Sequence, residues 1–223
     1  MAYFSKEFQK FFKELEKNNE KEWFHGNKKR YEKEVKEPFI TFLTDLIDAV
    51  QEVDGTIPHT AKEGMMRINK DIRFSKDKTP YKTHMAAIIS SHGKKDMRLP
   101  GMYIQLSNED VRMYSGCHSM EKDDLMSLRR HIKNNATQFD KLINDKKFKS
   151  VFGEVHGQKN KRLPPEFQEA AEMQPLIANK GFYYFKNYSP DLILDDKIIS
   201  KLVKDYSAGN DLGQFLKTGI TSG

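Results

Sequence analysis

The largest group of side chains able to bind a charged ligand lies in one short stretch, RINKDIRFSKDKTPYK, at residues 67–82. Six of its side chains are cationic and two are acidic, so its local net charge is six minus two, or +4. An arginine fork grips a phosphate or carboxylate in two places, and a lysine adds a compact positive charge. We therefore predict a site for a phosphorylated or carboxylated ligand, formed by Arg67, Arg73, Ser75, Lys76, Lys78, Tyr81 and Lys82.

The backbone expected for this stretch would align those groups. In an extended strand at 66–74, Arg67 and Arg73 share one face, because side chains alternate along a strand. Pro80 stiffens the loop that follows, which lowers the cost of ordering the loop when a ligand binds. The same residues allow two other interpretations. In one, the two aspartates neutralise the arginines in an internal ion network, and in the other the stretch is plain exposed surface.

The single tryptophan offers a second candidate position. Trp23 lies in NNEKEWFHGNKKRYE at 18–32. Large aromatic side chains are usually buried, which favours a core anchor. The alternative is a wall of the ligand pocket built from Trp23, Asn27 and Tyr31, in which the indole stacks on a base, a sugar or a guanidinium.

The sequence gives little support for a metal site or for a common catalytic motif. His84, His92, Cys117 and His118 would have to assemble any metal site, but no CxxC or HxH spacing supports one, so we expect neither a metal nor a cofactor. The motifs GxxxxGK[ST], GxGxxG, HExxH and GxSxG do not occur, which removes the common nucleotide-hydrolase, dinucleotide, metalloprotease and serine-hydrolase functions. We assign no catalytic residue, and whether the protein is an enzyme stays open here.

Composition sets the broad class. The 223 residues are 37% hydrophobic and 31% charged, which suits one folded domain and not a disordered chain. A net charge of +6 permits a nucleic acid, a phosphorylated metabolite or an acidic partner and requires none of them. The single cysteine cannot form an intramolecular disulfide. Without a secretory signal pattern or a long apolar run, we expect a soluble, cytoplasmic protein with no membrane partner.

The elements that must position these residues follow from apolar spacing. Helical spacing predicts helices at 5–17, from 20 to 50 with a kink or break at Pro38, and at 125–132, 139–143, 198–206 and 212–216. Alternation predicts strands at 65–69, 83–91, 101–107, 110–116, 148–155 and 181–188. Helices, then strands, then helices are typical of an α+β fold. We predict a single α+β domain over 1–223, with a mostly antiparallel sheet packed against helices from both halves of the chain.

Three blocks of the sequence resemble a known family, the domain of unknown function 2461 of bacteria and some fungi. The blocks are NNEKEWFHGNKKRYEKEVKEP, RINKDIRFSKDKTPYK and MYSGCHSMEKDDLMSLRRHI, and the second is the most specific. Lys70 departs from the family pattern, which often has an arginine there, and Cys117 and His118 replace small or aromatic residues. The resemblance implies a compact α+β domain and supplies no activity.

Three functions therefore remain open. The first is binding of, or catalysis on, a small anionic ligand at 67–82. The second is nucleic-acid binding, in which this stretch, the segment QKNKRLPPEF at 158–167 and the lysines at 146, 147 and 149 form one basic stripe. The third is a non-catalytic protein-interaction module, in which 67–82 is a structural ion-pair network. The first ranks highest, because acidic residues are interspersed and no nucleic-acid motif occurs. Ligand identity and oligomeric state do not follow from the sequence.

Overall fold

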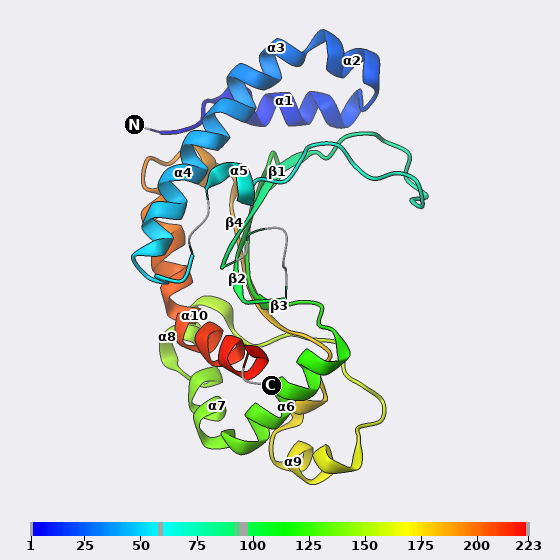
Figure 1. The fold of residues 1–223 in the computed structure, drawn as a ribbon. Helices are drawn as coiled ribbons and strands as arrows, with labels where there is room; N and C mark the ends of the chain where they lie inside the picture. The colour runs from blue at the N-terminus through cyan, green and yellow to red at the C-terminus, as the bar shows by residue number, and fades with distance from the viewer. Residues whose placement is uncertain (1, 58–59, 92, 94–97, 222–223) are drawn as a thin grey trace.

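The segments with alternating apolar residues form an antiparallel sheet at the centre of the molecule (Figure 1). The computed structural model describes residues 2–57, 60–91, 93 and 98–221. The strands lie in the order β1 (His84–Ser90), β2 (Gly101–Ser107), β3 (Val111–Cys117) and β4 (Phe182–Tyr188). Each strand is antiparallel to its neighbour, and short links join β1 to β2 and β2 to β3.

Helices from both halves of the chain pack against this sheet, which confirms the predicted fold class. The N-terminal half contributes α1 (Lys6–Lys17), α2 (Lys21–Gly26), α3 (Lys28–Tyr31), a π-helical turn (Glu32–Lys36), α4 (Glu37–Gln51) and α5 (Ala61–Gly64). The C-terminal half contributes α6 (Lys122–Asn134), α7 (Ala136–Ile143), α8 (Lys146–Phe152), α9 (Gln168–Met173) and α10 (Ile198–Thr221), with 3-10 turns at Pro165–Phe167, Pro175–Ala178 and Pro190–Leu194. Across the described part of the chain, every helix is too short or too polar to cross a lipid bilayer.

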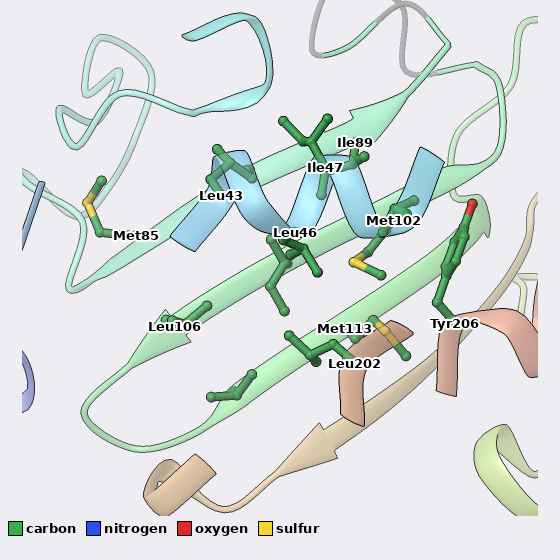
Figure 2. Close-up of a cluster of buried hydrophobic side chains, with 14 of the residues drawn as sticks. Leu43, Leu46, Ile47, Met85, Ile89, Met102, Leu106, Met113, Leu202 and Tyr206 are labelled. Carbon is green, nitrogen blue, oxygen red and sulfur yellow. The ribbon is translucent and has the colours of Figure 1, made fainter. Parts of the chain in front are cut away.

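One face of the sheet is the hydrophobic core. Met102, Ile104 and Leu106 alternate along β2 and are fully buried on this face. Helices α4 and α10 cover them with apolar side chains that include Leu46 and Leu202 (Figure 2). Burying a large apolar side chain contributes about 1.5–3 kcal/mol, so this layer holds the sheet against both helices. The opposite face of the sheet, which we call the open face, is turned away from α4 and α10 (Figure 1).

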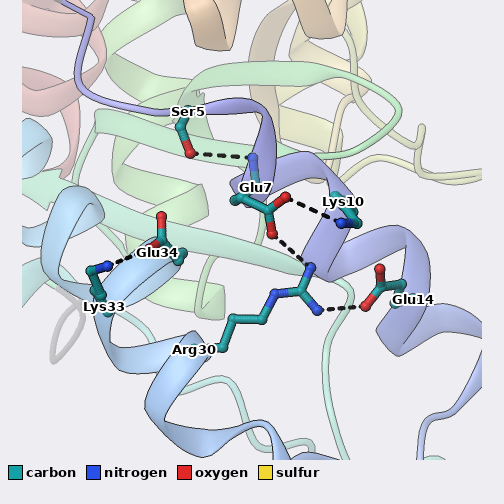
Figure 3. A network of polar contacts seen from close by, with 7 residues as sticks. All are labelled: Ser5, Glu7, Lys10, Glu14, Arg30, Lys33 and Glu34. Carbon is teal, nitrogen blue, oxygen red and sulfur yellow. Dashed lines mark hydrogen bonds and ion pairs between the residues drawn. The ribbon is translucent and has the colours of Figure 1, made fainter.

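The first helices pack together beyond the β1 end of the sheet. Phe8, Phe11 and Phe12 are buried on one face of α1, and Phe4 is buried just before the helix begins. Arg30 in α3 links the helices on their outer side. The Arg30 guanidinium donates to the carboxylates of Glu7 at 3.1 Å and Glu14 at 2.5 Å (Figure 3). The side chains of Arg30, Glu7 and Glu14 are partly exposed, so these ion pairs contribute little to the free energy of folding. Their main effect is to orient the helices relative to each other.

The predicted break at Pro38 takes the form of a π-helical turn. Proline has no amide hydrogen to donate to the preceding turn, and its ring crowds the carbonyl four residues earlier. The chain widens into π geometry at Glu32–Lys36, and Pro38 then lies in the first turn of α4, where no donor is needed. The helical direction therefore continues from α3 into α4.

Three sequence expectations on secondary structure are wrong. The segment 148–155 is not a strand, because Phe148 and Phe152 lie one helical turn apart and are buried together by α8. The two helices expected at 198–206 and 212–216 are one helix, α10. The strand expected at 65–69 is reduced to single bridges at Met65, opposite Ala87, and at Asn69, opposite Tyr81.

Residues 67–82 form a projecting hairpin that we call the arm (Figure 1). Its two sides are joined by backbone hydrogen bonds from Lys70 N to Pro80 O and from Lys82 N to Ile68 O. Asn19 anchors the base, because its amide donates to Tyr81 O at 2.9 Å and accepts from Tyr81 N at 3.0 Å. The far end has no such anchor within the described residues, and Phe74 there is 96% exposed.

Candidate functional site

The open face of the sheet carries polar and aromatic side chains where a core would carry aliphatic ones. Along β2 the half-buried residues are Tyr103 and Gln105, and along β3 they are Arg112 and Tyr114. Because side chains alternate along a strand, the buried residues between them point to the core and these four point away from it. Such a mixture on one sheet face is typical of a binding surface.

Strand register aligns these side chains in rows across the sheet. One row runs from Gln105 through Arg112 to Asn187. The next row runs from Tyr103 through Tyr114 to Phe185. Directly opposed side chains on neighbouring strands are in contact distance, so a polar row lies beside an aromatic row. Within them the Tyr103 hydroxyl donates to Gln105 Oε1 at 2.9 Å.

The aromatic row continues past β4 as a chain of rings that we call the aromatic ribbon. Its members, in spatial order, are Tyr103, Tyr114, Phe185, His156, Tyr183 and His118. Successive ring centroids lie between 4.9 and 6.0 Å apart. Tyr114 and Phe185 are nearly parallel, with 21° between their planes. His156 enters the ribbon through a backbone bridge to Tyr183 at the outer edge of β4.

A pocket of about 380 Å³ is hollowed into this face. Tyr103, Tyr114 and Tyr183 form its aromatic lining, and Arg112 contributes a cation. Gly116 keeps the floor of the pocket open, because it has a φ of 90° and no side chain. The volume falls within the usual range for small-ligand sites, about 300–1,000 Å³.

Cations gather at the β1 end of the open face, where the arm joins the sheet. We call Arg67, Lys70, Lys82 and Arg112 the cation cluster. Three of them, Lys70, Lys82 and Arg112, act on His84, the first residue of β1, whose pKa is lowered to about 4. Burial is the largest cause, followed by the positive charges of Lys82, Arg112 and Lys70, while the carboxylate of Asp110 acts in the opposite direction. His84 is therefore neutral at pH 7 and reports the positive field around it.

Two members of the cation cluster have no salt-bridge partner among the described residues. Lys70 pairs with Asp77 at 2.8 Å and Arg112 with Asp110 at 2.6 Å. Arg67 and Lys82 form no such pair within the part of the chain that the structure describes. The pKa of Lys82 is lowered by burial and by the charge of Arg67. A half-buried lysine with a cation for a neighbour would gain from a bound anion.

The lowered pKa of His84 predicts a change of stability with pH. In the unfolded chain His84 has its ordinary pKa of 6.5, whereas in the folded chain the pKa is about 4. Between these values the unfolded state binds the additional proton, so stability falls as pH is lowered from 6.5 towards 4. We expect His84→Gln to remove roughly 2 kcal/mol of this loss at pH 5, measured by urea unfolding at pH 5 and pH 7.

His25→Gln is the matched control, because His25 is exposed on α2, away from the cation cluster. In His25→Gln, the difference in unfolding free energy between pH 5 and pH 7 should be the same as in the parent protein. Equal pH dependence in the parent and in His84→Gln would contradict the buried, neutral state of His84.

The residues predicted for an anion site divide between the two ends of the arm. Arg67 and Lys82 lie at the base, in the cation cluster. Arg73, Ser75, Lys76 and Lys78 lie in the outer half, where Arg73 pairs with Asp71 at 2.7 Å and Lys78 donates to Ile72 O. Tyr81 is only 4% exposed and its ring stacks on Phe24 at 4.0 Å, so its side chain belongs to the core. These residues therefore do not converge on one pocket.

The alternative pocket wall lies in the helical end of the molecule. Trp23 is half-buried against Phe11, and its carbonyl accepts from the Asn27 amide. Tyr31 is buried, and its hydroxyl lies 3.7 Å from Met85 Sδ. None of the three lines the pocket on the open face, and their contacts are those of helix packing. The sequence preference for Trp23 as a packing residue matches this placement.

The thiol of Cys117 is unsuited to nucleophilic chemistry. Cys117 is fully buried, and burial raises its pKa far above the usual range for a thiol. His118 is exposed and contacts Tyr183, whereas His84 lies at the other end of the sheet. His92 lies outside the described residues, and among those that are described no group of His, Cys, Asp and Glu could hold a metal ion.

Sequence reasoning missed the open face. The signal was present, because alternation at 101–107 and 111–117 places Tyr103, Gln105, Arg112 and Tyr114 on one face. Alternation does not tell which face is covered by helices, and tyrosines are as frequent in cores as on exposed sheets. The rows and the aromatic ribbon also depend on strand register, which a single sequence does not supply.

Comparison with protein families gives one match, to the family described as Conserved hypothetical protein (DUF2461), over residues 7–215. This range contains the arm, every strand and the aromatic ribbon. None of the curated proteins searched matches the chain.

Proposed function

The chain belongs to the DUF2461 family of conserved hypothetical proteins, and we propose that it binds an anionic ligand on the open face of its sheet, beside the base of the arm. The ligand carries phosphate or carboxylate groups that lie at the cation cluster. The rest of the ligand enters the pocket lined by Tyr103, Tyr114 and Tyr183. The proposed anion site therefore lies at the base of the arm instead of over the whole of residues 67–82, and it includes Arg112.

The observation that carries the proposal is the concentration of positive charge around His84. Lys82 and Arg112 come from different segments of the fold and both lower the pKa of His84. Holding cations together beside a half-buried group costs free energy in the empty protein. A bound anion would offset this cost, and the pocket beside Arg112 gives it room.

Pyrophosphate is a suitable probe, because it carries the charge without an organic part. We expect it to bind and to raise the pKa of His84, followed by NMR of the imidazole C–H protons during a pH titration. Lys82→Gln and Arg112→Gln should each weaken binding about tenfold or more, since a charge-assisted hydrogen bond contributes roughly 1.5–3 kcal/mol.

The double variant Lys147→Gln/Lys149→Gln is the charge-matched control. These lysines are exposed on α8, which packs on the α10 side of the sheet (Figure 1). It should bind pyrophosphate as the parent does. Equal losses in the control and in the doubly substituted Lys82→Gln/Arg112→Gln protein would mean that net charge, and not the cation cluster, governs binding. An unchanged pKa of His84 at saturating pyrophosphate would also contradict the proposed site.

A second candidate function is a protein-interaction module with the arm as its contact. The outer half of the arm favours it, because Arg73 pairs internally with Asp71 while Phe74 is 96% exposed. Arg73 also lies over the Phe74 ring at 5.9 Å. If pyrophosphate fails to bind, Phe74→Ser in a pull-down against the parent protein's partners is the next measurement.

A further inference from the structure

We infer that the anionic ligand of the open face is a single-stranded nucleic acid, whose bases stack on the aromatic ribbon and whose phosphates lie between the cation cluster and the basic segment 158–163. This inference rests on the proposed function and names its ligand class. Three features carry it: the length of the ribbon, the positive charge on two sides of it and the amides beside it.

The aromatic ribbon is longer than a small ligand needs. One base covers one ring, yet the ribbon crosses β2, β3 and β4 and continues to His156 at the edge of the sheet. Its ring centroids are spaced by 4.9 to 6.0 Å without interruption. Half-exposed rings on a four-stranded antiparallel sheet can accept successive unpaired bases, because every base has a flat π-face.

Positive charge lies on two sides of the ribbon. The cation cluster lies along one side through Arg112, which stands on β3 next to Tyr114 in the neighbouring row. Beyond the rings of His156 and Tyr183, the basic segment 158–163 contains Lys159, Lys161 and Arg162 and no acidic residue. Backbone bonds join it to the residues before β4, from Lys180 N to Gln158 O and through the bridge of Lys159 to Asn179. A polyanion lying on the rings would meet cations on both of these sides.

Amide side chains accompany the rings. Gln105 and Asn187 belong to the polar row, and each amide can hydrogen-bond to the edge of a base stacked beside it. The side-chain carbonyl of Gln105 already accepts from the Tyr103 hydroxyl, and its amino group is the donor that a base edge would use. These contacts need exposed base edges and faces. A double helix hides its faces in its own stack, so the ribbon selects unpaired strands.

The test compares an oligonucleotide with an anion that has no bases. Fluorescence anisotropy with labelled oligo(dT) and oligo(U) of about 12 nucleotides measures affinity, with double-stranded DNA, polyphosphate and polyglutamate as competitors. We expect single strands to bind more tightly than any competitor, with a slope of log affinity on log salt near −3. Phe185 and His156 belong to the aromatic ribbon but do not line the pocket. Phe185→Val and His156→Val should each weaken oligonucleotide binding about tenfold and leave pyrophosphate binding unchanged.

Retained pyrophosphate binding also shows that these variants are folded. Tyr3→Val is the control, because Tyr3 is a half-buried tyrosine that packs on Phe42 at the helical end of the molecule. Oligonucleotide affinity that survives removal of either ring would overturn the inference, since charge alone would then hold the strand. Polyphosphate or polyglutamate that competes as well as oligo(dT) would overturn it too, while the anionic function would stand. Failure of pyrophosphate and oligonucleotide alike would overturn both.

Discussion

Replacing Arg129 by methionine should lower the free energy of unfolding by about 3–5 kcal/mol. Arg129 lies in α6, is 2% exposed and contacts no carboxylate within the described part of the chain. Its guanidinium donates to the carbonyls of Ile177 at 2.8 Å, Ala178 at 3.4 Å and Asn179 at 2.9 Å. These carbonyls end the 3-10 turn Pro175–Ala178 just before β4. Methionine keeps the length of the side chain and removes the guanidinium donor from the buried carbonyls of Ile177 and Asn179, whereas Ala178 O keeps the backbone amide of Asn160.

The neighbouring residue is the matched control. Arg130 is exposed and pairs with Glu166 at 3.0 Å, so Arg130→Met should cost 1 kcal/mol or less, as is typical at about 0–1 kcal/mol for surface pairs. Thermal melting should separate the two by roughly 10 °C, since about 2–4 °C accompanies each kcal/mol in a chain of this size. Arg129→Lys tests the geometry, because a lysine cannot reach all three carbonyls. Similar melting temperatures for the Arg129 and Arg130 variants would contradict this role.

Gly116→Ala is expected to be nearly as damaging, with a loss of at least about 3 kcal/mol. Gly116 has a backbone φ of 90°, which residues with a side chain rarely adopt. An alanine Cβ there would lie 2.2 Å from the carbonyl oxygen of Phe182 in β4. The obstacle is backbone, so β3 and β4 would have to separate to accept it.

Gly153→Ala distinguishes the two causes of that loss. Gly153 has a φ of 76°, yet beyond its chain neighbours no atom lies within 4 Å of the point that an alanine Cβ would occupy. Only the conformational cost of about 1 kcal/mol therefore applies. Urea unfolding of both variants gives the comparison, and equal losses would mean that the close approach of β3 to β4 is not tight at Gly116.

The parts of the fold that could be predicted from the sequence are those governed by local spacing. The strand expected at 101–107 has those bounds in the structure, because Met102, Ile104 and Leu106 alternate with polar residues between clear turns. The strand predicted at 65–69 does not form, because alternation shows which side chains share a face but not whether a partner strand is available. The break expected within α10 failed for another reason. Gly209 sits in the helix interior, where a Cβ would lie 2.5 Å from the Tyr184 ring, so the glycine marks close packing and not a helix end.

Part of the candidate site was predicted from the sequence, namely the cationic residues at the base of the arm. Arg67 and Lys82 were found because charge density is visible in the sequence. Arg112 was not found, because its partners are brought to it by the pairing of β2, β3 and β4. The aromatic ribbon was missed for the same reason, since β3, α6, α7 and α8 lie between Tyr103 and His156 in the sequence. Long-range pairing is a property of the closed fold, and single-sequence patterns are local.

The position of α10 has a consequence for how the chain reaches its native state during synthesis. This last helix packs on α4 from the N-terminal half, on β3 and on α6, α7 and α8. Hairpins among β1, β2 and β3 can form as soon as they leave the ribosome, because their contacts are local. Their apolar face, however, gains one of its two covers only after Ile198–Thr221 has emerged. The nascent chain therefore exposes aggregation-prone surface until α10 has emerged, and we expect its early folding to depend on chaperones that shield such surfaces.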